Sequence, residues 1–194
     1  GADLWVVQKD TLGPYAEPSS LTEDSERPIL AMRGVAQAAG VTYLTMQIAH
    51  GDNDVRVMVV GAEMGEPGLP GQPTHLISGR QIVRGHYEAV ADVKTGFAIG
   101  DRVKVRRNFY TIVGLTSRMV SSGGDPMLFL SLKDAQVAQF QKDSDAIVRQ
   151  RARTAANPQL NPPGNPAVAQ AVNAVQSGNT NVNAILVTIT PDAN

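Results

Sequence analysis

The segment from Gly96 to Leu115 constrains the fold more than any other part of the chain. Val103 and Val105 alternate with charged residues, which is the period-two pattern of a strand with one buried face. Arg107-Asn108 is the predicted turn, and Phe109 to Leu115 returns as a strand rich in β-branched and aromatic residues. One face of this predicted β-hairpin must therefore be covered by apolar side chains from elsewhere in the chain.

The other face of the hairpin carries the strongest local charge in the sequence. Its basic residues are Arg102, Lys104, Arg106 and Arg107. Such a stripe is usually solvated surface, where positive charge also discourages edge-to-edge pairing of strands. The alternative is a docking surface for an acidic patch on another protein. These four residues are therefore the candidate partner-binding residues.

The composition excludes several classes of protein. A chain of 194 residues can form one large domain or two small lobes with a sizeable core. The hydrophobic fraction of 42% and charged fraction of 18% are those of a globular protein. The net charge of −1 and aromatic content of 5% argue against nucleic-acid binding. The sequence contains no cysteine, which excludes disulfides, thiolate metal sites and cysteine nucleophiles. No apolar run approaches the ~20 residues needed to span a bilayer, and the N-terminus lacks a signal-peptide pattern.

The first part of the chain is predicted to contain a strand and a helix. Leu4 to Val7 is a short apolar strand, and Leu12 to Ser20 is a loop. Ser25 is the expected helix N-cap, and the helix should end at Gly34, which tolerates a left-handed conformation. The apolar side of this helix comprises Ile29, Leu30 and Met32.

A long hairpin should follow this helix. Val41 to Ala49 and Asp54 to Ala62 both alternate, and His50 to Asn53 has the residues of a tight turn. The inward faces of the two strands carry Leu44, Met46, Ile48, Val55, Val57 and Val59. Gly65 to Pro73 is a Gly/Pro-rich connector and the predicted boundary between lobes.

The remainder of the chain alternates between short strands and helices. His86 to Ala91 and Met127 to Leu132 are predicted strands, and a helix should begin at Lys133. An Asn/Pro-rich linker covers Asn157 to Pro166. A helix with Val168, Val172 and Val175 on one stripe and a final strand from Val182 to Ile189 complete the predicted elements.

This order of elements predicts an α+β fold with two lobes. We expect the first and last strands to share one sheet, which makes one lobe discontinuous. It would comprise residues 1–70 plus 160–194. A β-rich lobe would be inserted at residues 71–140, and residues 141–165 would form a helical, Asn/Pro-rich linker.

Candidate metal sites are weakly supported by their spacing. Asp52, Asn53 and Asp54 offer oxygen ligands that suit calcium, but the EF-hand spacing is missing and turn chemistry is the stronger interpretation. The three histidines, His50, His75 and His86, are dispersed and form no zinc pattern.

Candidate catalytic motifs are similarly incomplete. The loop Ser121 to Asp125 lacks the lysine of a P-loop and the Gly-x-Ser-x-Gly elbow, so a loop tip is the stronger interpretation. Glu63 and Glu66 are paired carboxylates near the predicted boundary, and acid–base catalysis would require them on opposing walls of a cleft.

A set of apolar and glycine motifs spreads over most of the chain. They are Gly100-Asp101-x-Val103-x-Val105 with Tyr110-x-Ile112-Val113-Gly114, Asp3 to Val7, Met32 to Val35, Leu128-Phe129-Leu130-Ser131-Leu132-x-x-Ala135-Gln136 and Asn183 to Val187. Together they resemble the periplasmic core domain of MacB-type, FtsX-like ABC transporter permeases. The segment from Gln136 to Asn165 is longer than the pattern of that family.

The resemblance implies a non-catalytic domain of two lobes that needs no cofactor of its own. It would lie on the periplasmic side of a bacterial inner-membrane protein, with both chain ends continuing into membrane helices. Those helices would connect it to a cytoplasmic ABC ATPase. Its outer partner would be a periplasmic adaptor (membrane fusion) protein or a lipoprotein carrier, and the full-length protein would be a homodimer. The domain would couple ATP hydrolysis to export or lipoprotein release.

Two other function classes remain as alternatives. A soluble hydrolase or ligand-binding protein would use a cleft between the lobes, with Glu63 and His86 as participants. A strongly perturbed acid–base pair in such a cleft would favour it. A nucleic-acid binder using the basic hairpin is disfavoured by net charge and by the scarcity of aromatic residues.

Overall fold

The computed structural model describes residues 2–9, 21–139, 141, 149 and 181–191. Its strands are β1 (Leu4–Val6), β2 (Leu21–Thr22), β3 (Val35–His50), β4 (Asn53–Ala62), β5 (Leu76–Gly79), β6 (Glu88–Asp92), β7 (Arg102–Val105), β8 (Asn108–Thr116), β9 (Met127–Ser131), β10 (Asn181–Val182) and β11 (Ala184–Ile189). Its helical elements are η1 (Glu23–Ser25), α1 (Glu26–Leu30), η2 (Val93–Thr95) and residues 132–139. The predicted loop at Leu12–Ser20, the linker at Asn157–Pro166 and the helix bearing Val168, Val172 and Val175 lie outside the described residues.

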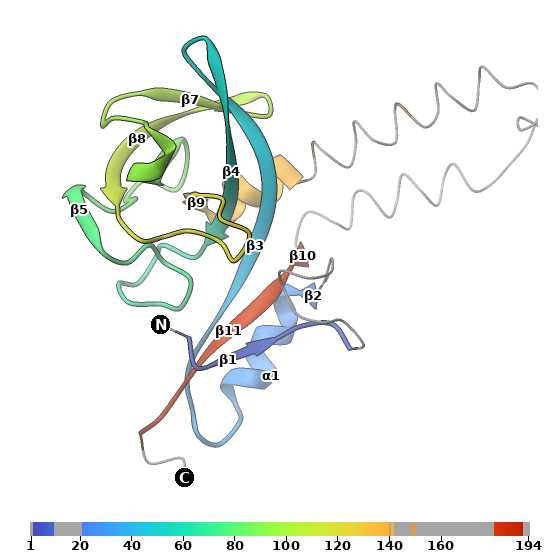
Figure 1. The fold of residues 1–194 in the computed structure, drawn as a ribbon. Coiled ribbons are helices and arrows are strands. Elements are labelled where there is room, and N and C mark those ends of the chain that lie inside the picture. The colour runs from blue at the N-terminus through green and yellow to red at the C-terminus, as the bar shows by residue number, and fades with distance from the viewer. Residues whose placement is uncertain (1, 10–20, 140, 142–148, 150–180, 192–194) are drawn as a thin grey trace, which may run out of the picture.

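Most of the strands belong to one mixed sheet, which confirms the predicted α+β class. Its order is β1-β11-β3-β4-β9-β6-β8-β5, with β7 also paired to β8, while β2 and β10 form a separate two-stranded sheet. The β4–β9 and β6–β8 pairs are parallel, and the other pairs are antiparallel. Strands β4 to β9 gather at one end of the molecule, and β1, β11 and α1 lie at the other (Figure 1). No helix among the described residues is long and apolar enough to cross a membrane.

The first and last strands are neighbours, as predicted. In the antiparallel β1–β11 pair, Leu4 lies opposite Val187. Asp3 joins both strands, because its amide donates to the Val187 carbonyl at 2.9 Å and its carboxylate accepts from the amide of Ile189 at 3.1 Å. The two ends of the described chain therefore enter one sheet side by side.

Strand β3 connects the two ends of the molecule. It is 16 residues long, whereas the sequence pattern predicted a strand only from Val41 to Ala49. Its first half pairs with β11 and its second half with β4, and the two ladders overlap at Val41. The predicted β3–β4 hairpin is confirmed, with His50 opposite Asn53 and a two-residue turn between them. One continuous strand thus belongs to both the terminal sheet and the β-rich end.

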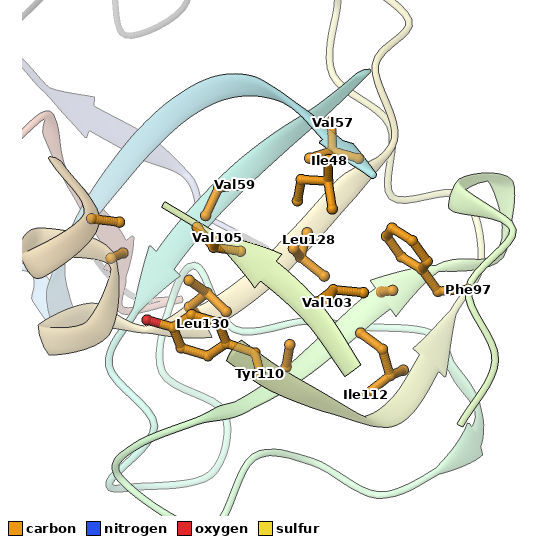
Figure 2. Packing of buried hydrophobic residues seen from close by; sticks show 14 of the residues in the cluster. Ile48, Val57, Val59, Phe97, Val103, Val105, Tyr110, Ile112, Leu128 and Leu130 are labelled. Atoms are coloured by element: carbon orange, nitrogen blue, oxygen red, sulfur yellow. The ribbon is translucent and has the colours of Figure 1, made fainter. Parts of the chain in front are cut away.

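The curled sheet encloses the main core, shown in Figure 2. Val103 and Val105 point inward, as their alternation predicted, and the exposed fractions of both are at most 2%. They pack with side chains from five other strands, and Ala135 and Ala138 of the helix at 132–139 belong to the same cluster. Its other buried members larger than alanine are Leu44, Ile48, Val57, Val59, Phe97, Tyr110, Ile112, Leu128 and Leu130. Met46 and Val55, predicted to face inward, are half-buried against this core.

Two local predictions were wrong. The β7–β8 turn consists of Arg106 and Arg107, because Val105 pairs with Asn108 and leaves two residues between the strands. Helix α1 ends at Leu30 with Ala31 as its C-cap, not at Gly34. Gly34 instead has a φ of 88° in the turn that leads into β3.

The side chains around α1 also differ from prediction. Ser25 is the N-cap residue, but its side chain forms no capping hydrogen bond, since η1 runs directly into the helix. Ile29 is buried as predicted, whereas Leu30 and Met32 are 44% and 59% exposed. The division into lobes at residues 1–70 plus 160–194, 71–140 and 141–165 stays a prediction.

Candidate functional site

The outward surface of the β7–β8 hairpin is the first candidate site. Arg102 and Lys104 are exposed on β7, and both lie over the ring of Phe109 on β8. The Arg102 guanidinium carbon is 5.2 Å from the ring centroid and the Lys104 ammonium nitrogen is 5.8 Å from it. Both distances are in the range of cation–π attraction, which holds the two charges side by side. We call Arg102, Lys104 and Phe109 the basic face.

The other two predicted residues of the stripe lie in the turn. Arg106 has a φ of 58°, and its Nε is buried with no hydrogen-bond partner among the described residues. Its side chain is half-buried, so Arg106 does not continue the row of exposed side chains formed by Arg102 and Lys104. Arg107 is exposed, and its amide donates to the side-chain oxygen of Gln141 at 3.3 Å. The structure brings Arg102 and Lys104 together over one aromatic ring, whereas Arg106 and Arg107 lie in the turn.

Phe109 is the residue of this surface that the sequence prediction missed. It is 48% exposed and lies opposite Lys104 in the antiparallel ladder. Predicting the two-residue turn at Arg106-Arg107 would have placed Phe109 opposite Lys104, since the position of the turn fixes which residues are cross-strand neighbours. Among the described residues, neither Arg102 nor Lys104 forms an ion pair with a carboxylate. The basic face thus presents two cations and an apolar ring to solvent.

A loop at residues 83–87 is the second candidate, because it is exposed yet firmly anchored. The buried Glu88 carboxylate accepts two hydrogen bonds from the Arg80 guanidinium, at 2.6 and 3.0 Å. The carboxylate also accepts hydrogen bonds from the main-chain amides of Val83 and Arg84, at 3.0 and 3.1 Å. The Arg80 hydrogen bonds, aided by those two amides, outweigh burial and lower the pKa of Glu88 to about 2.

A second buried carboxylate anchors the far end of this loop. Asp134 accepts the amide of Tyr87 at 2.9 Å, and its other oxygen is 2.7 Å from Nδ1 of His86. The hydroxyl of Ser131 donates to the carbonyl of Gly85 at 2.8 Å. Tyr87 is held at a φ of 62° with 55% of its surface exposed. Val83, Arg84, His86 and Tyr87 are thus displayed on a rigid support.

A cavity of about 560 Å³ lies beside this loop. Glu63 lines it, together with Arg84 of the loop and charged residues from η1, α1 and the helix at 132–139. Neither His86 nor Glu66 is among the residues that line this cavity. The structure therefore does not bring Glu63 and His86, the participants proposed for a hydrolase, together in this cavity.

The candidate metal ligands are also apart. His50 stacks near Phe97 with ring centroids 4.9 Å apart, His86 contacts Asp134, and His75 is exposed. Asp52 lies in the β3–β4 turn, as the turn interpretation predicted. Within the described ranges, no three His, Cys, Asp or Glu side chains are arranged to hold a metal ion.

The serine-rich loop has a structural explanation. The amide of Asp125 donates to the Ser121 hydroxyl at 3.1 Å, and the Ser121 amide donates to the Asp125 carbonyl at 2.8 Å. Val120 and Pro126 form the bridge that closes the loop. These bonds describe a closed loop tip, consistent with the stronger of the two sequence interpretations.

Comparisons with known proteins agree on one family. The family model of the MacB-like periplasmic core domain matches residues 1–175. The periplasmic region of MacB from Actinobacillus actinomycetemcomitans has a similar fold, with a TM-score of 0.58, 12% identity, and coverage of 98% of this chain and 75% of that one. The extracellular domain of the noncanonic ABC-type transporter YknZ from Gram-positive bacteria gives a TM-score of 0.56, 11% identity, and coverage of 97% and 83%. No curated protein matches the sequence. The chain belongs to the MacB-like periplasmic core domains, and it is the periplasmic domain of a MacB-like ABC transporter permease.

Proposed function

We propose that this domain couples ATP hydrolysis by a cytoplasmic ABC ATPase to an outer partner, in a process of the export or lipoprotein-release type. It acts without catalysis and without a cofactor of its own. The observation that supports this proposal is the course of β3. The strand pairs with β11 beside the chain ends, and it pairs with β4 at the β-rich end. From β4 the sheet continues through β9 and β6 to β8 and β7, which carry the basic face. Movement applied at the chain ends therefore has a continuous hydrogen-bonded path to that face.

This proposal requires the domain to move as a rigid body in the full-length transporter. The domain contains no cysteine, so within it I189C on β11 and D52C in the β3–β4 turn are unique sites for spin labels, and any cysteine elsewhere in the transporter is first replaced by serine. Double electron–electron resonance measures the distance between the two labels. We expect the distance between the labels at I189C and D52C of one copy to be the same in the nucleotide-free and ATP-bound states. The distance between D52C labels on the two copies of the proposed homodimer should change. A nucleotide-dependent change within one domain, or none between copies, would contradict the proposal.

The basic face is the surface that we propose for the outer partner. That partner is a periplasmic adaptor protein or a lipoprotein carrier with an acidic patch. Arg102 and Lys104 are held beside the exposed ring of Phe109, and both Arg and Phe are enriched in protein interfaces. Complementary charge also raises the rate of association. Arg107 extends the positive charge into the turn.

Charge reversal tests this surface. The double variant R102E/K104E should weaken partner binding by at least about tenfold at low salt and reduce its salt dependence. The matched control is R33E/K94E, which changes the net charge equally at two exposed basic residues elsewhere. Calorimetric titration with the purified partner at two salt concentrations provides the measurement. Equal affinities for R102E/K104E and the control would show that the partner binds elsewhere.

A further inference from the structure

We propose that a second, smaller cavity binds a neutral and mainly apolar small molecule that carries one hydrogen-bond donor. The cavity has a volume of about 310 Å³, at the lower end of the range typical of small-molecule sites. It lies against the sheet face that points away from the main core. The inference does not depend on the coupling role proposed above.

The floor of the cavity is a continuous apolar surface. It is formed by Leu186 of β11, Tyr43 of β3, Val60 of β4 and Phe129 of β9, which are four adjacent strands. Each of these residues alternates with a neighbour that faces the other way, since side chains along a strand point to opposite faces. An apolar sheet face normally packs against a second layer of secondary structure. Here an irregular segment takes that place.

The roof is the Gly/Pro-rich connector, and one side chain holds it in shape. The Gln72 amide nitrogen donates to the carbonyls of Glu63 and Glu66, at 2.8 and 2.6 Å. Its oxygen accepts the amide of Gly68 at 3.0 Å. Leu69 and Pro70 of this loop line the cavity. Protein interiors contain few voids larger than one water molecule, so a pinned loop above a space of this size indicates a built pocket.

The lining indicates the chemistry of the ligand. None of the described residues that line the cavity is charged, which disfavours an ionic ligand as the occupant. Met119 and Met127 contribute polarizable thioethers that adapt to ligands of different shape. Trp5 and Tyr43 add aromatic surface to the lining. The lining therefore favours a ligand that consists mainly of an alkyl chain or an aromatic ring.

Gln81 supplies the polar requirement. Its amide nitrogen donates to the carbonyl of Pro73 at 2.7 Å, which fixes the orientation of the amide group. Its Oε1 is buried and accepts no hydrogen bond from any described group. Leaving a buried acceptor without a hydrogen bond costs free energy. Gln81 is one of the residues that line the cavity. Because its Oε1 has almost no accessible surface, a ligand O–H or N–H would satisfy this acceptor once the Gln81 side chain turned the oxygen toward the cavity.

The test uses a matched pair of probes on the 194-residue protein, 4-hexylphenol and 4-hexylanisole. The two differ in whether the ring oxygen carries a hydrogen. Trp5 is the only tryptophan in the sequence, so its fluorescence reports binding. We expect saturable binding of both probes, with the phenol about 2- to 10-fold tighter, the effect of one net hydrogen bond. In Q81M both probes should bind with equal affinity.

Methionine methyl resonances locate the probe independently. Those of Met119 and Met127 should shift on titration, whereas those of the exposed Met32 and of Met46, which packs against the main core, should not. This measurement needs no substitution in the apolar floor. Absence of saturable binding, shifts spread over all four methionines, or equal affinity of the two probes for the unmodified protein would each overturn the proposal.

Discussion

Replacing Gly61 with alanine is expected to lower the free energy of unfolding by about 1–3 kcal/mol, the usual cost of overpacking a core. Gly61 is buried on β4, where the helix at 132–139 packs against the sheet. An added Cβ would overlap with the Cβ of Ala135 and the hydroxyl of Thr42. Both neighbours are themselves buried, so the helix would have to move away from the strand. Urea denaturation at pH 7 measures the loss.

Gly65 provides the matched control for this substitution. Apart from Gly65 and its two chain neighbours, no atom of the described residues lies within 4 Å of the position of its Cβ, so Gly65→Ala should change stability by no more than about 0.5 kcal/mol. Adding Ala135→Gly to the Gly61 variant should recover part of the lost stability, because it removes one of the two overlaps. Unchanged stability of the Gly61 variant would show that the helix does not pack closely on β4.

The second large effect concerns pH and the loop at residues 83–87. The pKa of Glu88 is about 2 in the folded protein, compared with 4.5 for an unperturbed glutamate. The folded state therefore binds fewer protons than the unfolded state between these values. The resulting stabilisation is fully present above about pH 4.5 and is lost as the pH falls through 2. The difference corresponds to about 3 kcal/mol.

Glu88→Gln should remove this contribution. At pH 7 the variant should be less stable than the unmodified protein by about 2–3 kcal/mol, and the two should approach one another near pH 2. Thermal unfolding at several pH values between 2 and 7 gives the comparison. Asp54→Asn controls for the loss of a carboxylate, because Asp54 is exposed on β4. If the Glu88→Gln variant kept the original pH dependence, another group would have to be its source.

The β7–β8 hairpin shows how far sequence patterns reach. Alternation placed Val103 and Val105 in the core correctly, since burial of one face demands it. The residue types predict the turn one position too late, at Arg107-Asn108, because asparagine favours turns. Cross-strand pairing decided otherwise and placed Arg106 at a φ of 58°, a conformation that is rare for arginine. That one-residue shift also hid the pairing of Lys104 with Phe109.

Strand β3 shows why the rest of the sheet was not predictable. Residues 36–40 read Ala-Gln-Ala-Ala-Gly, which has weak strand propensity and little apolar alternation. They become a strand because β11, which lies far along the chain, pairs with them. Local propensity contains no information about such a distant partner.

The candidate sites depended on contacts of the same kind. The anchors of the loop at 83–87 come from Glu88 and Asp134, and single buried carboxylates leave no periodic signal. The second cavity lies under a connector that has neither helical nor strand periodicity. The sequence marked that connector as a boundary between lobes and offered no indication that it covers an apolar face.

The antiparallel order of β1, β11 and β3 determines how the domain withstands a pull on its ends. A force drawing both ends away together acts along the strands, so the β11–β3 hydrogen bonds from Ala184 to Ile189 share the load in shear. Sliding by one residue would turn the buried Ile185 and Val187 outward, which resists slippage. A force that separates the ends from each other would instead peel β1 off β11 one hydrogen bond at a time. The domain is therefore stiff toward joint traction and compliant toward separation of its ends.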